Sequence, residues 1–91
     1  MLTAKITTKF NIVDVLRYPE RYVDECCDLE ILTVPDEEAI GGVLRFLIGV
    51  ENGEHYVVVE DDYSADDIYC LEGESLMETF IRALNDNLKR E

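Results

Sequence analysis

Basic residues are nearly missing from the central part of this 91-residue chain. Between Asp24 and Glu78 there are seventeen acidic residues and a single base, Arg45. The flanking residues 1–23 and 79–91 hold the other seven bases, and the chain has a formal net charge of −13. A field of this sign repels phosphates, so it argues against direct binding to nucleic acid. It predicts instead a surface that attracts a positively charged partner.

Long apolar runs and targeting signals are also lacking. No apolar stretch approaches the roughly 18 residues of a membrane-spanning helix, and residues 1–5 do not resemble a signal peptide. The sequence therefore predicts a soluble, cytoplasmic protein that does not bind membranes. With 47% hydrophobic residues and a length of 91, the chain has the composition of a folded protein and room for one core. We expect a single domain over residues 1–91.

Residues that form disulfides or bind metals are few. The three cysteines, Cys26, Cys27 and Cys70, have no C-x-x-C spacing, and adjacent cysteines bridge each other only with strain. We therefore expect reduced, mostly buried thiols. The single histidine, His55, is a poor candidate for the fourth ligand of a zinc site. No metal site is predicted.

Catalytic and calcium-binding motifs are missing as well. A calcium loop starting at Glu60 would place Ala65 and Leu71 where the EF-hand pattern has Gly and Glu. The chain contains no glycine-rich phosphate loop, G-x-S-x-G or H-E-x-x-H motif. A nucleophilic pair of Cys70 and His55 would need an orienting carboxylate, and carboxylates are too common here to be a signal. We expect a non-enzymatic protein with no catalytic residues and no cofactor.

The strongest local pattern is a β-hairpin. Two apolar segments, Val43–Glu51 and Glu54–Glu60, are separated by Asn52-Gly53, the preferred pair for a two-residue type I′ turn. This turn fixes the register, so Arg45 should face Glu60 across the hairpin and be neutralised by it. One face of the hairpin is then strongly apolar and must be covered by helices. Its residues are Leu44, Phe46, Ile48, Val50, Val57 and Val59.

Helices are predicted on both sides of the hairpin. Asn11 has the character of an N-cap, and Pro19 should end a first helix near Tyr18 and begin a second one. Towards the C-terminus, Ser75 and Glu78 match a capping box. The apolar stripe of that last helix consists of Leu76, Met77, Phe80, Ile81, Ala83, Leu84 and Leu88.

Three further segments have strand character. Leu2–Phe10 alternates as an edge strand does, although a frayed arm fits it too. Leu29–Val34 is rich in β-branched residues, and Ile68–Leu71 is a candidate for a short additional strand. The predicted fold is α+β, a three- to four-stranded, mostly antiparallel sheet with N-terminal and C-terminal helices packed on one face.

The acidic residues concentrate at the ends of the predicted strands. They gather at Pro35–Glu38, at the hairpin tip and at Glu60–Glu74, where loops could display carboxylates like the phosphates of DNA. Tyr56 and Tyr63 lie near them, and tyrosine can pack against and hydrogen-bond with Arg and Lys. A merely solvated acidic surface is the alternative, and Tyr56 could equally just cover Gly49. The predicted partner-binding residues are Asp36, Glu37, Glu38, Glu51, Glu54, Tyr56, Asp61, Asp62, Tyr63, Asp66, Asp67, Glu72 and Glu74.

The order of these elements resembles that of small acidic phage anti-CRISPR proteins, which inhibit Cas9. The resemblance rests on Phe46–Val50, Asn52-Gly53, His55-Tyr56-Val57-Val58-Val59, Glu60–Asp62 and Leu76–Leu88. It implies a DNA mimic that occupies the Arg- and Lys-lined site where Cas9 reads the PAM duplex. The break at Pro19 and the strand Leu29–Val34 depart from that pattern.

The sequence therefore favours a non-enzymatic inhibitor that binds a basic nucleic-acid-binding protein, with a CRISPR effector such as Cas9 as the first candidate. Two other classes stay open. An antitoxin or nuclease-immunity protein would use the same acidic surface against a basic toxin. A homodimeric scaffold or interaction subunit would associate through Leu47, Tyr56 and Val58, or through an uncovered edge strand.

Overall fold

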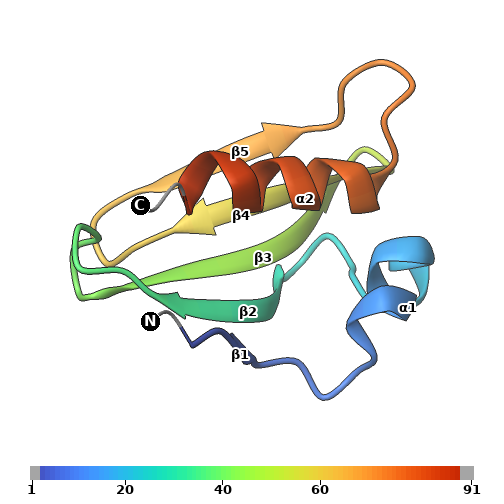
Figure 1. The fold of residues 1–91 in the computed structure, drawn as a ribbon. Coiled ribbons are helices and arrows are strands. Elements are labelled where there is room, and N and C mark those ends of the chain that lie inside the picture. Colours follow the sequence, from blue (N-terminus) through green and yellow to red (C-terminus); the bar gives the residue numbers. More distant parts are fainter. Residues whose placement is uncertain (1–2, 89–91) are drawn as a thin grey trace.

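The computed structural model describes residues 3–88, which fold into one five-stranded sheet and two α-helices (Figure 1). All neighbouring strands are antiparallel, in the order β1-β2-β3-β4-β5. Both α-helices cover the same face of the sheet. The predicted α+β class and helix layer are confirmed, but the sheet has five strands rather than three or four. Along the chain the elements are β1 (Lys5–Ile6), α1 (Ile12–Arg17), the 3₁₀-helix η1 (Pro19–Arg21), β2 (Leu29–Pro35), β3 (Val43–Glu51), β4 (Glu54–Glu60), β5 (Ala65–Tyr69) and α2 (Leu76–Asn87).

The first edge strand is much shorter than its alternating sequence predicted. Only Lys5 and Ile6 pair with β2, opposite Thr33 and Leu32. Leu2, where the predicted strand Leu2–Phe10 began, lies outside the described residues. Such a short, lysine-bearing edge is a common way to discourage pairing with another chain.

The other edge strand begins earlier than predicted, at Ala65 instead of Ile68. Two aspartates, Asp66 and Asp67, occupy its centre, and aspartate is depleted in strands, which hid the strand in the sequence. Pairing with β4 over five residues, from Glu60 to Tyr56, overrides that local preference.

The N-terminal helices follow the proline break. Asn11 Oδ1 accepts the backbone N–H of Asp14 at 3.0 Å, and α1 ends at Arg17, two residues before Pro19. The predicted second helix is only the single turn η1, and residues 22–28 after it are not helical. No helix within residues 3–88 has the length and apolar character needed to cross a membrane.

The hairpin and the last helix agree with their sequence signals. Asn52 and Gly53 have φ values of 54° and 81°, as a type I′ turn requires, and the β3–β4 register is the predicted one. At the start of α2, Ser75 Oγ accepts the Glu78 N–H while the Glu78 carboxylate accepts the Ser75 N–H. This completes the predicted capping box.

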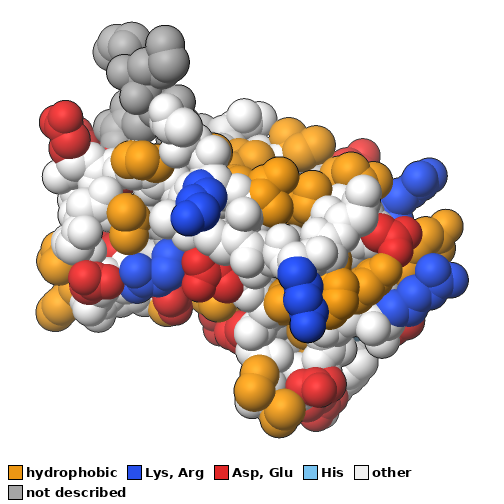
Figure 2. All heavy atoms as spheres, turned by 90° about the horizontal axis from the view of Figure 1, so that it is seen from below, with side chains coloured by type: hydrophobic (Ala, Val, Ile, Leu, Met, Phe, Trp, Pro, Cys, Tyr) orange, Lys and Arg blue, Asp and Glu red, His pale blue; other side chains and the backbone are white. Residues whose placement is uncertain are grey.

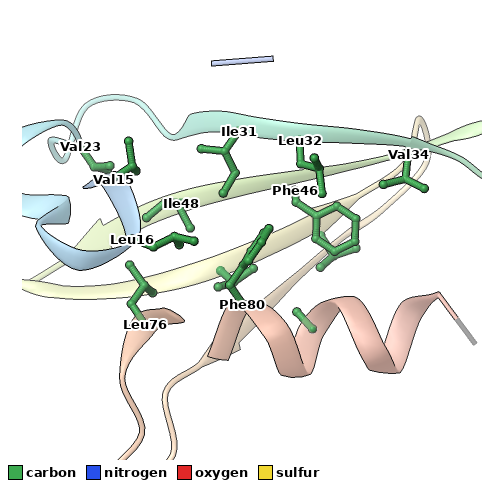
Figure 3. Packing of buried hydrophobic residues seen from close by; sticks show 13 residues of the cluster. Val15, Leu16, Val23, Ile31, Leu32, Val34, Phe46, Ile48, Leu76 and Phe80 are labelled. Carbon is green, nitrogen blue, oxygen red and sulfur yellow. The ribbon is translucent and has the colours of Figure 1, made fainter. Parts of the chain in front are cut away.

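The core lies between the sheet and the helix layer (Figure 3). Phe46 of β3 is fully buried and meets Phe80 of α2 edge-on, with ring centroids 6.0 Å apart. The predicted apolar face of the hairpin is therefore confirmed as the core side of the sheet. Ile81 is the exception in the predicted helix stripe. It is 48% exposed, because the residue after Phe80 is turned about 100° around the helix axis.

Candidate functional site

The sheet face opposite α1 and α2, which we call the open face, carries no helix among residues 3–88 (Figure 1). Because side chains alternate along a strand, the register places Tyr56 beside Tyr69, and Val58 beside Asp67, on this face. The open-face residues of β2 to β5 are Glu30, Thr33, Pro35, Val43, Arg45, Leu47, Gly49, Glu51, Glu54, Tyr56, Val58, Glu60, Ala65, Asp67 and Tyr69.

Two tyrosines and a carboxylate lie over the middle of the open face. The rings of Tyr56 and Tyr69 have centroids 5.0 Å apart. Beside them, a Cβ added at Gly49 would come within 2.8 Å of Asp28 Oδ1 and 2.9 Å of Tyr56 Cζ. Glycine therefore lets the ring and the carboxylate rest directly on β3, and the interpretation that Tyr56 covers Gly49 is confirmed. We define the tyrosine–carboxylate cluster as Asp28, Glu51, Tyr56, Asp67 and Tyr69.

The electrostatics of this cluster indicate a strongly negative, partly desolvated surface. The pKa of Asp28 is raised above its ordinary value, first by burial and then by the charge of Asp67. The pKa of the Tyr56 hydroxyl is raised by burial and by Asp28, Asp67 and Glu51. Burial, Asp67 and Glu51 also raise the pKa of Tyr69. Each shift reflects the cost of negative charge here, so a cation placed on the cluster would be stabilised.

Apolar side chains of the open face are already partly covered. Val58 is only 4% exposed, and Leu47 and Tyr56 are half-buried. The three residues proposed for a hydrophobic dimer interface therefore do not form an exposed apolar patch. The open face presents charged groups and the edges of aromatic rings rather than a continuous apolar surface.

The only base of the acidic segment is engaged within the protein. Arg45 Nε lies 2.9 Å from Glu60 Oε2, as the register predicted, and its Nη2 lies 3.0 Å from Asp62 Oδ1. Hydrogen bonds to these two carboxylates raise the pKa of Arg45. Asp62, one of the predicted binding residues, is thus an internal ion-pair partner.

Two other predicted binding residues shape loops. Asp61 Oδ1 accepts the backbone N–H groups of Tyr63 and Ser64, both at 2.8 Å, and these bonds lower the pKa of its carboxyl group. Asp36 is 7% exposed, and its side chain accepts the N–H of Glu38 at 3.0 Å. Their carboxylates satisfy backbone donors in the two turns, which is a common structural role of aspartate.

Glu74, another predicted binding residue, is held by α2. Its carboxylate lies 2.8 Å from Arg82 Nη2 and accepts the N–H of Leu71 at 2.9 Å. These bonds, chiefly the one from Arg82, lower the pKa of Glu74 from its ordinary 4.5 to about 2. The pair fixes the turn between β5 and α2.

Glu74→Gln is expected to lower the melting temperature at pH 7 by about 5 °C, because the amide loses the charged bond to Arg82. A carboxyl group with a lowered folded-state pKa stabilises the fold above its ordinary pKa, and this stabilisation is lost as the pH falls through the folded value. The gap between wild type and variant should therefore close between pH 4.5 and about 2, as followed by thermal melts monitored by circular dichroism. Glu72→Gln, an exposed change in the same turn, is the control and should shift the melting temperature by less than about 2 °C. A gap that does not depend on pH would contradict the assigned role of Glu74.

The acidic loops predicted as one site are divided between the two ends of the sheet (Figure 1). Asp36, Glu37, Glu38, Asp61, Asp62 and the 80% exposed Tyr63 lie at the end where β3 starts and β4 ends, and Glu51, Glu54, Glu72 and Glu74 lie at the other end. Asp66 and Asp67 are not loop residues but belong to β5. Of these two, Asp67 is on the open face and Asp66 on the opposite one, because strand side chains alternate.

Sequence reasoning missed two members of the cluster. Tyr69 shares a face with Asp67 by simple alternation, so recognising β5 from Ala65 onwards would have found it. Asp28 gave no usable signal, because it comes opposite Gly49 only through the register of β2 on β3, in which Leu29 pairs with Ile48, and no tight turn between these strands fixes that register in the sequence.

Two bases of the N-terminal segment lie over aromatic rings. Seen from the side of the molecule that carries β1 and α1, Lys and Arg side chains stand among hydrophobic and acidic ones (Figure 2). Lys9 lies over the Phe10 ring at 5.4 Å, and Arg21 over Tyr18 at 4.4 Å.

The thiols and the histidine differ in exposure. All three cysteines are exposed, which contradicts the expectation of burial, because Cys26 and Cys27 lie in a turn rather than a helix. A hydrogen bond to Asp24 raises the pKa of Cys26 to about 11, so this thiol is protonated at neutral pH. Cys70 and His55, the pair considered from the sequence, both line a hollow of about 590 Å³ next to α1 and the start of α2. Burial lowers the pKa of His55. Its Nε2 has no partner within the described residues.

Known proteins give no further guide to this surface. Comparisons of the chain with models of protein families, with curated proteins and with solved structures found no match.

Proposed function

We propose that this protein is a non-enzymatic inhibitor that binds a basic, nucleic-acid-binding protein through its open face and competes there with DNA. The observation that carries the proposal is the tyrosine–carboxylate cluster. Its carboxylates lie together on one sheet face, and the described ion pairs engage other acids, namely Glu60, Asp62 and Glu74. Its two tyrosines add flat rings on which guanidinium groups can pack.

The size of the molecule is compatible with mimicry of a short duplex. Its longest dimension is 34 Å, over which DNA carries about 20 phosphate charges. The chain has 21 acidic residues, although the internal roles of several mean that fewer are presented to a partner. A basic groove built for phosphates would gain from such a surface when its own counterions are released. The resemblance to anti-CRISPR proteins makes guide-loaded Cas9 the first partner to test.

The proposal is tested by binding the protein to guide-loaded Cas9 and measuring the affinity at increasing salt, with and without a PAM-containing duplex. We expect the affinity to fall by about tenfold or more between about 50 and 200 mM salt, because screening weakens exposed charge pairs. We also expect the protein and the duplex to exclude each other. A salt-independent complex, or one that holds both, would contradict DNA mimicry on this effector.

If Cas9 does not bind, the same competition can be run on a bacterial lysate. The chain serves as bait, and excess duplex DNA should release the captured basic protein. The control bait is the variant Asp28→Asn/Glu51→Gln/Asp67→Asn, which lacks the three carboxylates of the tyrosine–carboxylate cluster. A captured protein that duplex DNA fails to release would contradict the proposed mechanism for any effector.

A further inference from the structure

Cys26 and Cys27 bring two thiols together in a way that adjacent residues seldom do. In a strand, neighbouring side chains point to opposite faces. Here the chain makes a tight turn from Asp24 to Cys27, closed by a β-bridge between these two residues. The two Sγ atoms lie 3.5 Å apart, in van der Waals contact, and both cysteines are exposed.

The turn is anchored on both sides. Asp24 Oδ1 accepts two hydrogen bonds from Cys26, one from its backbone N–H at 3.2 Å and one from its thiol at 2.9 Å. Glu25 Oε2 accepts the N–H of Asn52 at 3.1 Å, which ties the turn to the tip of the β3–β4 hairpin. The thiols are thus presented to solvent by a braced turn rather than by a free loop.

The ligand set indicates which kind of centre this pair can hold. Zinc needs four ligands in a tetrahedron, and no group of three or more His, Cys, Asp or Glu side chains within residues 3–88 is arranged to hold a metal ion. A trivalent, three-coordinate centre needs only three ligands. If it brings one ligand of its own, two soft thiol sulfurs complete its shell.

We propose that Cys26 and Cys27 form a dithiol site for trivalent thiophilic centres, with organoarsenicals as the ligand class. For phenylarsine oxide, the arsenic–oxygen double bond and two S–H bonds break, two As–S bonds form, and the oxygen leaves with both hydrogens as water. No atom changes oxidation state.

The second As–S bond is formed within one molecule, so its effective concentration is high. Linking two binding groups in this way raises affinity by about 100-fold or more over either alone. A single thiol such as Cys70, whose Sγ lies 3.8 Å from the backbone oxygen of His55, has no second thiol beside it. Cys70 therefore serves as an internal control.

The experiment titrates the full chain with phenylarsine oxide and follows intact mass and free thiols. Wild type and Cys70→Ser should take up one equivalent, with a mass gain of the reagent less one water and the loss of two free thiols. Cys26→Ser and Cys27→Ser should each bind about 100-fold more weakly, with unchanged far-ultraviolet circular dichroism.

The proposal is overturned if wild type forms no adduct, if either single variant binds as tightly as wild type, or if Cys70→Ser abolishes binding. A competition experiment with zinc tests whether the site is three-coordinate. An equal concentration of Zn²⁺ should leave arsenical binding unchanged, and displacement by zinc would overturn the assignment to a three-coordinate centre.

Discussion

Replacing the three carboxylates of the tyrosine–carboxylate cluster, in the variant Asp28→Asn/Glu51→Gln/Asp67→Asn, is expected to weaken binding to the basic partner by about 100-fold or more. Coupling between close charge pairs at protein interfaces is worth about 1.5 kcal/mol or more per pair, and three pairs would be lost together. The variant should also show a shallower salt dependence, because fewer charges are paired in the complex. Affinity at several salt concentrations, measured by titration calorimetry or fluorescence anisotropy, checks both results.

The control for this variant changes the same number of charges elsewhere. Glu20→Gln/Glu72→Gln/Asp86→Asn replaces three exposed acids on η1, in the β5–α2 turn and on α2. It should lower affinity by less than about fivefold, since distant rim charges act mainly through the screened long-range field. Equal losses in the two triple variants would show that net charge, and not the open face, drives binding.

We do not expect the substitution Asp28→Asn to destabilise the fold. The raised pKa of Asp28 means that its ionised form is disfavoured in the fold, by burial and by the charges of Asp67 and Glu60. Asp28→Asn should therefore raise the melting temperature at pH 7. Below the ordinary pKa of aspartate, near pH 3.8, the carboxyl group is protonated in both states, so this gain should disappear. A lower melting temperature for Asp28→Asn at pH 7 would contradict the electrostatic description of the cluster.

Phe46→Ala is expected to have the largest effect on stability, about 3–5 kcal/mol. The side chain is fully buried between the sheet and α2, and it meets Phe80 edge-on. Its removal loses the transfer free energy of the ring and leaves a cavity that the two packed layers cannot close. Because domains of this size are stable by only about 5–15 kcal/mol, the loss is a large part of the total. Urea unfolding followed by circular dichroism measures it.

Two companion variants keep this result interpretable. Phe46→Leu retains most of the buried volume and should cost only about 1 kcal/mol, which remains measurable if the alanine variant is unfolded. Tyr63→Ala removes an aromatic ring that is 80% exposed and should change stability by less than about 0.5 kcal/mol. Similar losses for Phe46→Ala and Tyr63→Ala would contradict the position of the core.

Local interactions explain why much of the fold was predictable. The type I′ turn at Asn52-Gly53 fixes the hairpin register within a few residues, and the register then identifies the core face and the Arg45–Glu60 pair. The capping box at Ser75 and the break at Pro19 also act over one helical turn. Each of these signals is complete within a short stretch of sequence.

The candidate site was only partly predictable. The sequence placed Tyr56 away from the helices and marked the acidic character of the surface. It assigned Asp36, Asp61 and Asp62 to binding, although their carboxylates have partners within the protein. The sequence does not distinguish an aspartate with an internal partner from one that faces solvent. The composition gives the number of charged groups, but only the folded structure shows which groups are close enough to pair.

By itself, the sequence determined the class of fold, the hairpin register and the sign of the protein's own net charge. Only the tertiary structure decided which carboxylates share a face. Asp28 reaches Tyr56 because Gly49 leaves space on β3, and Asp67 joins them because β5 pairs with β4. These residues are 11 to 39 positions apart in the sequence. Such closeness arises from packing the whole sheet, and no local propensity records it.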